Sequence, residues 1–487
     1  MPRHNSNYEA YYILDGWLND AINAFPRRLG EPDEQGQRGR AHPKKRSPIS
    51  TTYHTLKTLF DKQRESVDFL LAALKQYRGA LDGSHTGVGK TVIASRVALE
   101  LGVPVAVVCP KIVIPSWERE LKEVGVTPIF VTNYEKIKRG NEHLTKAGKK
   151  IYRWKLPTDT LIIWDECHKC KSAYSQNSQM LIAAKQAGYY NLLLSATACQ
   201  DPTEMRSMGY VLDKHSLNKP DGDKKSWTSW MMRYGCKQDP WHKWVSGPLA
   251  KLSDLNKELY GVNCVKLTPA DLPAAFADNQ IITEPLAFSG LSDIAKFYKQ
   301  HGITPEIVDT FLEGGGASPH ILVEILHARQ LAEAAKVPDI INMIEDANEE
   351  GISVAVFVNF VDTVKSLAAA FPDASIIVGG QSAMVREDNV QRFQTNQTRV
   401  IICNIAAGGV GVSLHDEHGG HPRMSLISPT FNVKEYVQTL GRIHRANAKS
   451  PAIQRVLVAS KTIEEKVLTA LEAKRKAMDT LHTKQEP

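Results

Sequence analysis

The feature that most restricts the fold of this chain is a series of short apolar runs, each ending in small or polar residues. Helix-like stretches separate consecutive runs, and this alternation is typical of buried parallel strands in an α/β sheet. The alternation lapses around 198–284 and then resumes. The sequence therefore predicts two separate α/β sheets, with a boundary somewhere in 270–340. The apolar runs are 103–110, 127–132, 160–166, 190–197, 354–360, 374–380, 399–404 and 424–429.

A candidate phosphate-binding loop, SHTGVGKT, lies between an apolar stretch and a helix-like run. Its glycines, Gly87 and Gly89, let backbone N–H groups curl around a phosphate at a helix N-terminus. We expect Lys90 to reach the β- and γ-phosphates and the Thr91 hydroxyl to ligate Mg²⁺. The usual pattern is GxxxxGK[ST], and here Ser84 takes the place of the first glycine, so the GKT core carries the match.

Such a loop needs an acidic residue at the end of a nearby strand to hold the metal, and LIIWDECH supplies one. Asp165 is predicted to bind Mg²⁺ through water, and Glu166 to orient and deprotonate the attacking water. The tripeptide SAT at 195–197 follows another apolar run, and its hydroxyls could bond to this acidic pair. Alone, the tripeptide carries little information.

A second basic motif, QTLGRIHR at 438–445, lies about 350 residues beyond the phosphate loop. Arg442 and Arg445, three residues apart, could reach a phosphate from the side opposite the loop. Neither motif could hydrolyse a nucleotide well by itself. Together they predict a nucleotide site in a cleft between two domains, which ATP could open and close.

Composition limits the class of protein only loosely. At 487 residues the chain is too long for one ordinary core. Its 60 basic and 53 acidic residues leave a formal charge of +7, which permits a polyanionic partner without requiring one. The seven cysteines are irregularly spaced and are expected to be reduced thiols. Cys167 and Cys170 form a lone CxxC without a second pair, so no zinc site is predicted.

No apolar run is long enough to span a membrane, and the N-terminus lacks the core of a signal peptide. We therefore expect a protein of the cytoplasm of a microbial or phage-infected cell, or of a nucleus-like compartment, neither secreted nor in a membrane. Residues 1–26 could form an amphipathic helix, and 27–48 resemble a mobile basic linker.

The ordered motifs GVGKT, DECH, SAT and QTLGRIHR resemble motifs I, II, III and VI of the superfamily 2 helicases. Within that superfamily the chain is most similar to the Swi/Snf-type branch of DNA translocases, including its viral and phage members. VVCPKIVIPSWERELKE resembles motif Ia of that branch, VTNYEKIK its next DNA-contacting segment and AAGGVGVSL its motif V. TIEEKVLTALEAKRKAMD is similar to its closing helix, so the resemblance covers roughly 56–480.

The resemblance implies an α/β fold of two tandem RecA-like P-loop domains, with an N-terminal extension and a small helical insertion. On this basis the N-terminal extension covers 1–50, the ATP-binding domain 51–284 with a helical insertion at about 214–270, the second domain 285–480 and a tail 481–487.

The resemblance also implies roles for single residues. Gln63 corresponds to a glutamine that reads adenine, and His168 couples the nucleotide site to the nucleic-acid side. Gln438 is expected close to the catalytic water or the γ-phosphate, with Arg442 and Arg445 as arginine fingers. The expected cofactors are ATP and Mg²⁺. The catalytic set is Glu166, Lys90, Gln438, Arg442 and Arg445; the nucleotide-binding set is Gln63, Gly87, Gly89, Lys90, Thr91, Asp165 and Gly411; the metal set is Thr91 and Asp165.

A track for nucleic acid is implied across both domains, opposite the nucleotide cleft. Backbone amides and hydroxyls there would hold phosphates with little sequence specificity. The expected partner is DNA, with RNA possible, and a monomer is the default. The track residues are Pro110, Lys111, Thr132, Asn133, Asn359, Phe360, Gly409 and Ser413. Trp227, Trp230, Trp241 and Trp244 stand among cations and could stack on bases, although packing of a helical insertion is the favoured interpretation.

The chain departs from the Swi/Snf pattern in two motifs: motif VI continues as RANAKS, and motif III reads SAT. These departures argue against nucleosome remodelling but do not argue against an ATP-driven motor. The leading hypothesis is an ATP-dependent DNA helicase or translocase. The alternatives are an RNA helicase of the same superfamily and an ATP-gated nucleic-acid clamp that barely turns over. A P-loop kinase or GTPase is disfavoured by the second α/β half.

Overall fold

The computed structural model describes residues 57–148, 150–217, 225–238, 242, 244–246, 249–287, 291–312, 319–408 and 412–482. Thr58–Pro487 form one compact unit. The helix predicted at 1–26 and the basic linker predicted at 27–48 lie outside the described residues. Within the described part, no helix is both long enough and apolar enough to cross a membrane.

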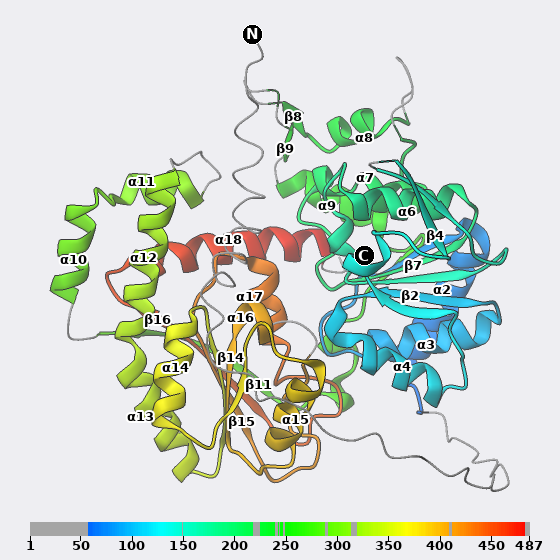
Figure 1. Ribbon diagram of the computed structural model, residues 1–487. Coiled ribbons are helices and arrows are strands. Elements are labelled where there is room, and N and C mark those ends of the chain that lie inside the picture. The colour runs from blue at the N-terminus through cyan, green and yellow to red at the C-terminus, as the bar shows by residue number, and fades with distance from the viewer. Residues whose placement is uncertain are drawn as a thin grey trace, which may run out of the picture. The chain divides into compact units, whose positions relative to one another are not determined.

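The first sheet has six parallel strands in the order β10-β1-β7-β6-β2-β3 (Figure 1). Successive residues of its central strands alternate between two cores: Val105 and Val107 of β2 enter one, and Ala106 and Val108 enter the other. Because all six strands are parallel, their carboxyl ends lie at the same edge of the sheet. The strands are β1 (Gly79–Asp82), β2 (Val105–Cys109), β3 (Phe130–Asn133), β6 (Leu161–Asp165), β7 (Tyr190–Leu194) and β10 (Cys264–Val265).

Helices cover both faces of this sheet, and with it they form the first lobe, 58–265. The core beneath Val105 includes side chains of α2 (Asp61–Tyr77), α3 (Lys90–Leu101) and α4 (Ile114–Glu123). The core on the opposite face receives α6 (Gln176–Gln186), α7 (Arg206–Val211), α8 (Trp227–Arg233) and α9 (Leu249–Leu259). A short helix, α5 (Tyr134–Ile137), follows β3 and leads into a hairpin of β4 (Leu144–Gly148) and β5 (Ile151–Trp154).

The second sheet is also parallel and six-stranded, in the order β11-β16-β15-β12-β14-β13. With its helices it forms the second lobe, 279–482. The strands are β11 (Asn279–Leu286), β12 (Ser353–Val358), β13 (Ser375–Ile377), β14 (Val400–Asn404), β15 (Arg423–Ile427) and β16 (Ala452–Ala459). The helices are α10 (Leu291–Gln300), α11 (Pro305–Leu312), α12 (Pro319–Ala335), α13 (Val337–Glu349), α14 (Val361–Ala370), α15 (Ala383–Gln394), α16 (Ile405–Gly408), α17 (Val433–Leu440) and α18 (Ile463–His482).

All eight predicted strands are confirmed, and two parallel sheets confirm the predicted α/β class. The predicted boundary after residue 284, however, falls inside β11. All eight residues of β11 pair with β16, so the chain passes between the sheets over 266–278. The sequence did not reveal β11 because most of its residues are exposed, and it therefore lacks the continuous apolar character of a buried strand.

The predicted insertion around 214–270 is helical in part, since α8 and α9 lie there. Trp227 and Trp230 are buried in the first lobe, and Trp230 Nε1 donates a 2.9 Å hydrogen bond to Glu258 Oε1. Trp244 packs partly buried against the same core, whereas Trp241 lies outside the described residues. The packing interpretation is therefore confirmed for Trp227 and Trp230.

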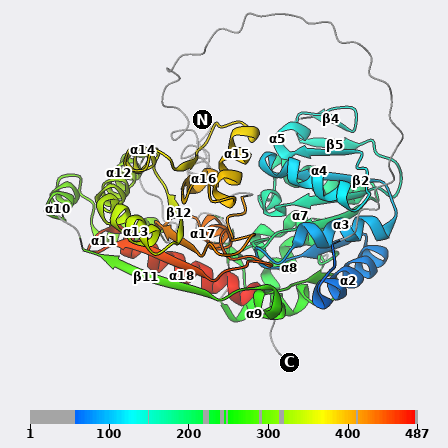
Figure 2. The ribbon, with the colours of Figure 1, turned by 90° about the horizontal axis from the view of Figure 1, so that it is seen from below.

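A fully buried ion pair fixes the start of α18 in the second lobe. The Lys336 ammonium lies 2.8 Å from Glu464 Oε2, and both side chains are almost completely excluded from solvent. Lys336 also donates to the Leu457 carbonyl at 2.9 Å, while Glu464 accepts the backbone N–H of Ala459 at 2.8 Å. The pair therefore joins the end of β16 and the start of α18 to the junction of α12 and α13. From there, α18 extends to contact α9 of the first lobe (Figures 1 and 2).

Replacing Lys336 with Met should lower the free energy of unfolding by about 3–5 kcal/mol, because the Glu464 carboxylate would stay buried without its cation. Urea unfolding followed by circular dichroism measures the change. Lys365→Met is the matched control, since Lys365 forms an exposed pair with Asp362 and should change stability little. Equal effects of the two substitutions would contradict a structural role for the buried pair.

Candidate active site

The predicted phosphate loop connects β1 to α3, as a phosphate-binding loop requires. Lys90 begins α3, and its ammonium donates to the carbonyls of Ser84 and His85, both at 2.8 Å. Burial lowers the pKa of Lys90, while the nearby carboxylates of Asp82, Glu166 and Asp165 oppose that shift. The buried amine therefore points into the loop, where it would meet a bound phosphate.

Two glycines of the loop cannot be replaced without displacing other groups. Gly87 and Gly89 both have left-handed backbone conformations, with φ of 83° and 92°. A Cβ on Gly87 would lie 3.0 Å from the Arg445 Cα, and a Cβ on Gly89 would lie 2.7 Å from Gln63 Nε2. Other groups thus lie close to the backbone of the loop, as its glycines predicted. One of these groups belongs to the arginine motif of the second lobe.

Gln63 supports the loop from α2. Its Nε2 donates to the Val88 carbonyl at 2.8 Å, and its Oε1 accepts the Phe60 N–H at 3.1 Å. Both ends of the amide are thus bonded to backbone, and the side chain is buried. Gln63 lies beside the phosphate loop as the resemblance implied, while its contact with adenine stays a prediction.

The acidic pair ends β6 at the same sheet edge. Asp165 Oδ2 accepts a 2.8 Å hydrogen bond from Trp117 Nε1, and Asp165 Oδ1 accepts the Glu166 N–H at 2.9 Å. Glu166 has a left-handed conformation, with φ of 52°, which is uncommon for a residue with a side chain. Local strain of this kind clusters at functional sites.

His168 and Ser195 hold the Glu166 carboxylate. Glu166 Oε2 lies 3.1 Å from His168 Nδ1 and accepts a 3.4 Å hydrogen bond from Ser195 Oγ. Ser195 Oγ also accepts the Thr197 N–H at 3.1 Å, which links the SAT segment to the acidic pair. Of the two hydroxyls of that segment, the one of Ser195 therefore bonds to the acidic pair as the sequence had suggested, and the one of Thr197 does not.

The surroundings of the two carboxyls shift their pKa values in opposite directions. Burial and the adjacent Glu166 raise the pKa of Asp165. Burial alone would also raise the pKa of Glu166, but the hydrogen bond from His168 and the charges of Lys90 and Arg442 outweigh it and lower that pKa. Glu166 is thus the carboxyl that stays ionised most readily.

The second lobe reaches this carboxylate through α17. The helix is capped by Asn432, whose side chain accepts the Lys434 N–H at 3.0 Å. Near its C-terminus, Gln438 Nε2 donates a 3.3 Å hydrogen bond to Glu166 Oε1. Since Glu166 lies on the first lobe, this bond brings two of the predicted catalytic residues together across 272 positions of sequence.

The two predicted arginine fingers follow α17 and lie next to the phosphate loop. Both guanidinium groups donate to the Val412 carbonyl at 3.0 Å, and the Ala446 N–H donates to the Gly87 carbonyl at 3.0 Å. Burial and the neighbouring Arg445 lower the pKa of Arg442 to about 9, and burial lowers the pKa of Arg445 to about 10. A phosphate would supply the negative charge that a carbonyl partner lacks.

A second contact between the lobes was not expected from the sequence. Glu204, which follows the SAT segment, lies 3.1 Å from Lys171 Nζ and 3.4 Å from Lys434 Nζ of α17. Burial would raise the pKa of Glu204, but the two ammonium charges lower it to about 2. One helix of the second lobe is therefore bonded to two carboxylates of the first.

Residues predicted to contact nucleic acid have mixed environments. Lys111 is exposed, but Thr132 and Asn133 are buried, and Asn133 Oδ1 accepts the Lys136 N–H at 2.8 Å as the cap of α5. Asn359 donates its amide to Glu333 at 2.7 Å and to the Pro429 carbonyl at 2.9 Å, and Phe360 is only 8% exposed.

The remaining predicted sites lie in two segments, one after β2 and the other in motif V (406–414). Pro110 precedes a short 3-10 helix, Lys111–Val113. The Ser413 carbonyl accepts a 2.8 Å hydrogen bond from Gln394 Nε2. Gly409 and Gly411 lie outside the described residues, so their predicted roles are not placed.

The residues present fit ATP and a divalent cation. The backbone of the glycine loop can approach a ligand closely because its glycines lack side chains. Cations of both lobes, Lys90 and Arg445, lie beside the loop, as a polyphosphate requires. Asp165 and Thr91 offer oxygen donors, the type that Mg²⁺ prefers. Among the described residues, no cluster of three or more His, Cys, Asp or Glu could hold a metal ion by itself, so Mg²⁺ would depend on the nucleotide.

Comparison with known proteins agrees with this geometry. The helicase conserved C-terminal domain matches residues 335–447. The "Putative ATP-dependent RNA helicase L364" of Acanthamoeba polyphaga mimivirus is 32% identical over 464 residues, 89% of this chain and 85% of the viral protein. The chain belongs to the ATP-dependent helicases of superfamily 2, and it is therefore an ATP-hydrolysing enzyme.

More distant similarities extend over much of the chain. "Protein CHROMATIN REMODELING 24" of Arabidopsis thaliana is 21% identical over 503 residues, covering 84% of this chain and 45% of the plant protein. A solved structure, the "Sulfolobus solfataricus SWI2/SNF2 ATPase core in complex with dsDNA", is 17% identical, with a TM-score of 0.36. That similarity covers 89% of this chain and 94% of the other.

Replacing Gly87 with Ala should lower ATP turnover by about 100-fold, because the new methyl group would push Arg445 away from the loop. Steady-state phosphate release measures the loss. Gly102→Ala is the matched control: its φ is also left-handed, at 68°, but nothing lies within 4 Å of the added Cβ. Both variants should lose some stability, and an equal loss of turnover would contradict the contact as its cause.

Proposed function

We propose that this protein is an ATP-driven motor that moves along DNA by closing and reopening its two lobes. The observation that carries the proposal is the hydrogen bond from Gln438 of the second lobe to Glu166 of the first. A catalytic carboxylate held from the opposite lobe makes hydrolysis depend on the relative position of the lobes. Conversely, hydrolysis would change that position.

Each residue has a proposed task on ATP. The loop around Gly87 and Gly89 binds the phosphates through backbone N–H groups, and Lys90 exchanges its carbonyl partners for phosphate oxygens. Glu166 takes the proton of the attacking water, whose place Gln438 helps to fix. Mg²⁺, held by Thr91 and through water by Asp165, neutralises phosphate charge when bound.

The arginines would make the site sensitive to the γ-phosphate. Arg442 is buried and Arg445 partly buried beside the loop, and negative charge developing on the transferred phosphoryl group would draw them towards it. Loss of that phosphate removes the attraction and weakens the contact between the lobes. Binding and release of one phosphate thus drive a cycle of closure and opening.

DNA is the proposed track because the motif set resembles that of the Swi/Snf-type translocases. The Arabidopsis relative's printed name, which refers to chromatin remodelling, supports the same choice. The second candidate is RNA, and one observation favours it: the viral relative is named as an RNA helicase. Both tracks offer the same phosphodiester backbone to sequence-tolerant contacts.

ATP hydrolysis should be stimulated by DNA, and Glu166→Gln should reduce it by about 100- to 10,000-fold because an amide cannot accept the proton. Binding of a fluorescent ATP analogue should survive in this variant. Glu65→Gln, on the exposed face of α2, is the control and should hydrolyse ATP normally. Robust hydrolysis by Glu166→Gln would exclude Glu166 as the base.

The nucleic-acid partner is tested by comparing ATPase stimulation by duplex DNA, single-stranded DNA and RNA at one salt concentration, since all such affinities depend on salt. Stronger stimulation by either form of DNA supports the proposal. Stimulation by RNA alone would replace DNA with RNA as the track.

A further inference from the structure

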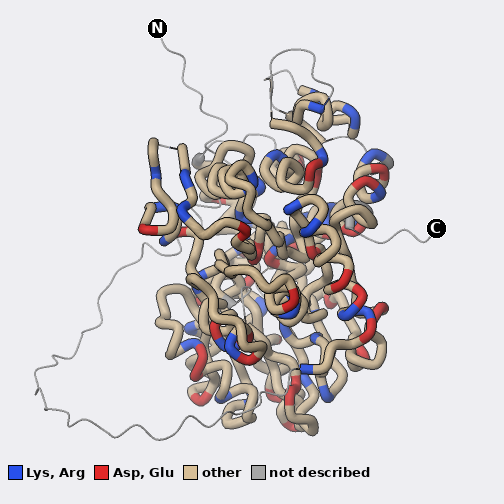
Figure 3. Tube along the Cα trace, turned by 90° about the vertical axis from the view of Figure 1, so that its right-hand side faces the viewer, with Lys and Arg blue, Asp and Glu red and all other residues tan. Residues whose placement is uncertain are grey.

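One segment of the first lobe carries a marked excess of positive charge, and only its first residues, 131–138, overlap a stretch that resembles a helicase motif. Residues 131–160 contain eight Lys or Arg against three Asp or Glu, an excess of five in thirty residues. The whole chain has an excess of only seven. The linker predicted at 27–48 has a similar excess, seven Lys or Arg against three Asp or Glu, whereas Figure 3 shows the two signs interspersed along much of the described trace. The segment at 131–160 folds as α5 and the β4–β5 hairpin, which we call the basic arm (134–155).

The arm has an apolar face and a basic face. Leu144 pairs with Trp154 across the hairpin, and both are buried, with Trp154 Nε1 donating to the Met180 carbonyl at 3.0 Å. The alternate residues on β5 and just after it, Ile151, Arg153 and Lys155, are exposed. Tyr152 is buried on the inner face, so the alternation of a strand turns the charges outward.

Contacts within the arm fix its shape, and a ring contact joins it to the rest of the first lobe. The Tyr152 hydroxyl donates to the Lys138 carbonyl of the α5 end at 3.2 Å, and the Lys155 N–H donates to the His143 carbonyl at 2.8 Å. The His143 ring lies 5.1 Å from that of Phe130 on β3. The outward cations are therefore presented on an anchored scaffold rather than on an isolated hairpin.

The arm's cations have no acidic partners within the described part of the chain. The nearby acids are otherwise engaged: Glu142 lies 3.3 Å from His143, and Asp159 lies 2.8 Å from Arg78. The third acid, Glu135, is exposed on α5. Uncompensated like charges repel one another, so the exposed Arg153 and Lys155, which share the outward face of the hairpin, favour a polyanionic ligand. The described cations without an ion pair are Lys136, Lys138, Arg139, Lys146, Lys150, Arg153 and Lys155.

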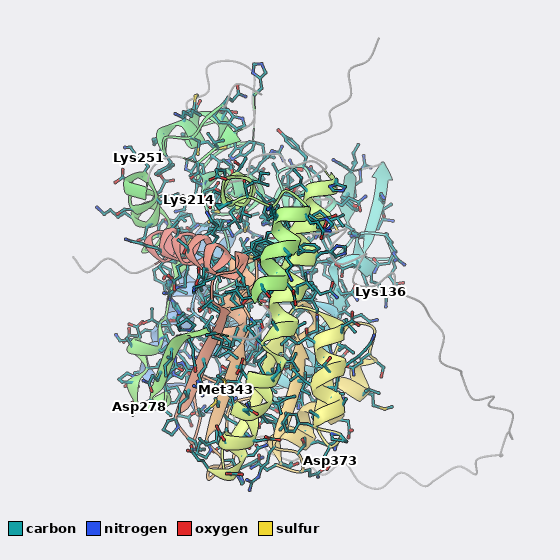
Figure 4. All side chains as sticks on the ribbon, turned by 90° about the vertical axis from the view of Figure 1, so that its left-hand side faces the viewer. Lys136, Lys214, Lys251, Asp278, Met343 and Asp373 are labelled. Atoms are coloured by element: carbon teal, nitrogen blue, oxygen red, sulfur yellow. The ribbon has the colours of Figure 1, made fainter. Side chains whose placement is uncertain are left out.

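The location of the arm also points to nucleic acid. The arm continues directly from the carboxyl end of β3, where Thr132 and Asn133 were predicted to meet phosphates. Figure 2 shows α5, β4 and β5 grouped together, and Figure 4 shows Lys136 at the margin of the view, across from Lys251. Alternate residues of a strand are about 7 Å apart, roughly twice the 3.4 Å rise per phosphate of a DNA strand.

We propose that the basic arm binds the phosphodiester backbone of the nucleic acid on which the motor moves, extending its contact beyond the helicase motifs. This inference rests on the proposed function for the identity of the ligand. The arm supplies affinity and not catalysis, because its outward side chains lie on a hairpin that contributes nothing to the ATP site. It therefore acts on nucleic-acid binding and leaves turnover at saturation unchanged.

The test is a triple variant, Lys150→Gln with Arg153→Gln and Lys155→Gln, in the full-length protein. These side chains are exposed, so the buried face of Trp154 is untouched. Fluorescence anisotropy with labelled duplex DNA, single-stranded DNA and RNA at several salt concentrations gives the dissociation constant and its salt dependence. We expect at least about tenfold weaker binding, and a salt slope smaller by about 2–3, from the loss of three phosphate contacts.

The matched control removes the same charge elsewhere: Lys251→Gln, Lys257→Gln and Lys296→Gln, all exposed on α9 and α10. It should bind almost as tightly as the wild type, and an equal loss in both variants would show a bulk charge effect and overturn the inference. Unchanged affinity and salt slope in the arm variant, or a wild type that binds none of the three nucleic acids, would also overturn it. The form of nucleic acid whose affinity falls most identifies the ligand.

ATPase measurements keep this inference separate from the proposed function. With saturating nucleic acid, the arm variant should reach the wild-type maximal rate and differ only in the concentration needed for half-stimulation. A lower maximal rate at saturation would contradict a role in affinity alone. Binding that depends on the arm, in a wild type whose ATPase no nucleic acid stimulates, would refute the motor and retain the arm.

Discussion

The structure depends on bringing charges of opposite lobes to one place, where they are partly or fully shielded from solvent. Glu166 and Lys90 belong to the first lobe, and the arginines at 442 and 445 belong to the second. Charge buried in this way is costly unless partners neutralise it, and the hydrogen bonds found here go largely to carbonyls and to Gln438. A triphosphate with its cation would complete the set, so this arrangement suits a binding site for ATP as well as a contact between lobes.

Helix α17 is the element through which the lobes communicate. Its Gln438 bonds to Glu166, the proposed catalytic carboxylate, while Lys434 pairs with Glu204, which follows the SAT segment. The same loop region that bonds to Glu166 through Ser195 therefore also receives a charge from the second lobe. Contacts at both ends of one short helix make its position sensitive to the nucleotide site and to the first lobe's core. The buried pair of Lys336 with Glu464 then anchors α18, whose far end reaches α9.

The features predicted correctly from the sequence are those that depend on a pattern of neighbouring residues. Eight strands were visible because each is an apolar run with helices on both sides, and the phosphate loop was visible because only glycine tolerates its conformation. Strand β11 was missed because it is exposed, and the Glu204–Lys434 pair because its partners lie 230 residues apart. Nothing local in either segment marks such a pairing. The environment of Asn359 could not be predicted either, since Glu333, which accepts a hydrogen bond from its side-chain amide, lies on α12.

The central claim is that the second lobe supplies cations to the γ-phosphate of ATP bound on the first. The most direct measurement compares Arg442→Ala and Arg445→Ala with the wild type in single-turnover hydrolysis, alongside calorimetric binding of ADP. The account predicts hydrolysis slower by about 1,000-fold or more, with ADP affinity nearly unchanged because ADP lacks the group that the arginines address. Hydrolysis at the wild-type rate in both variants would contradict it.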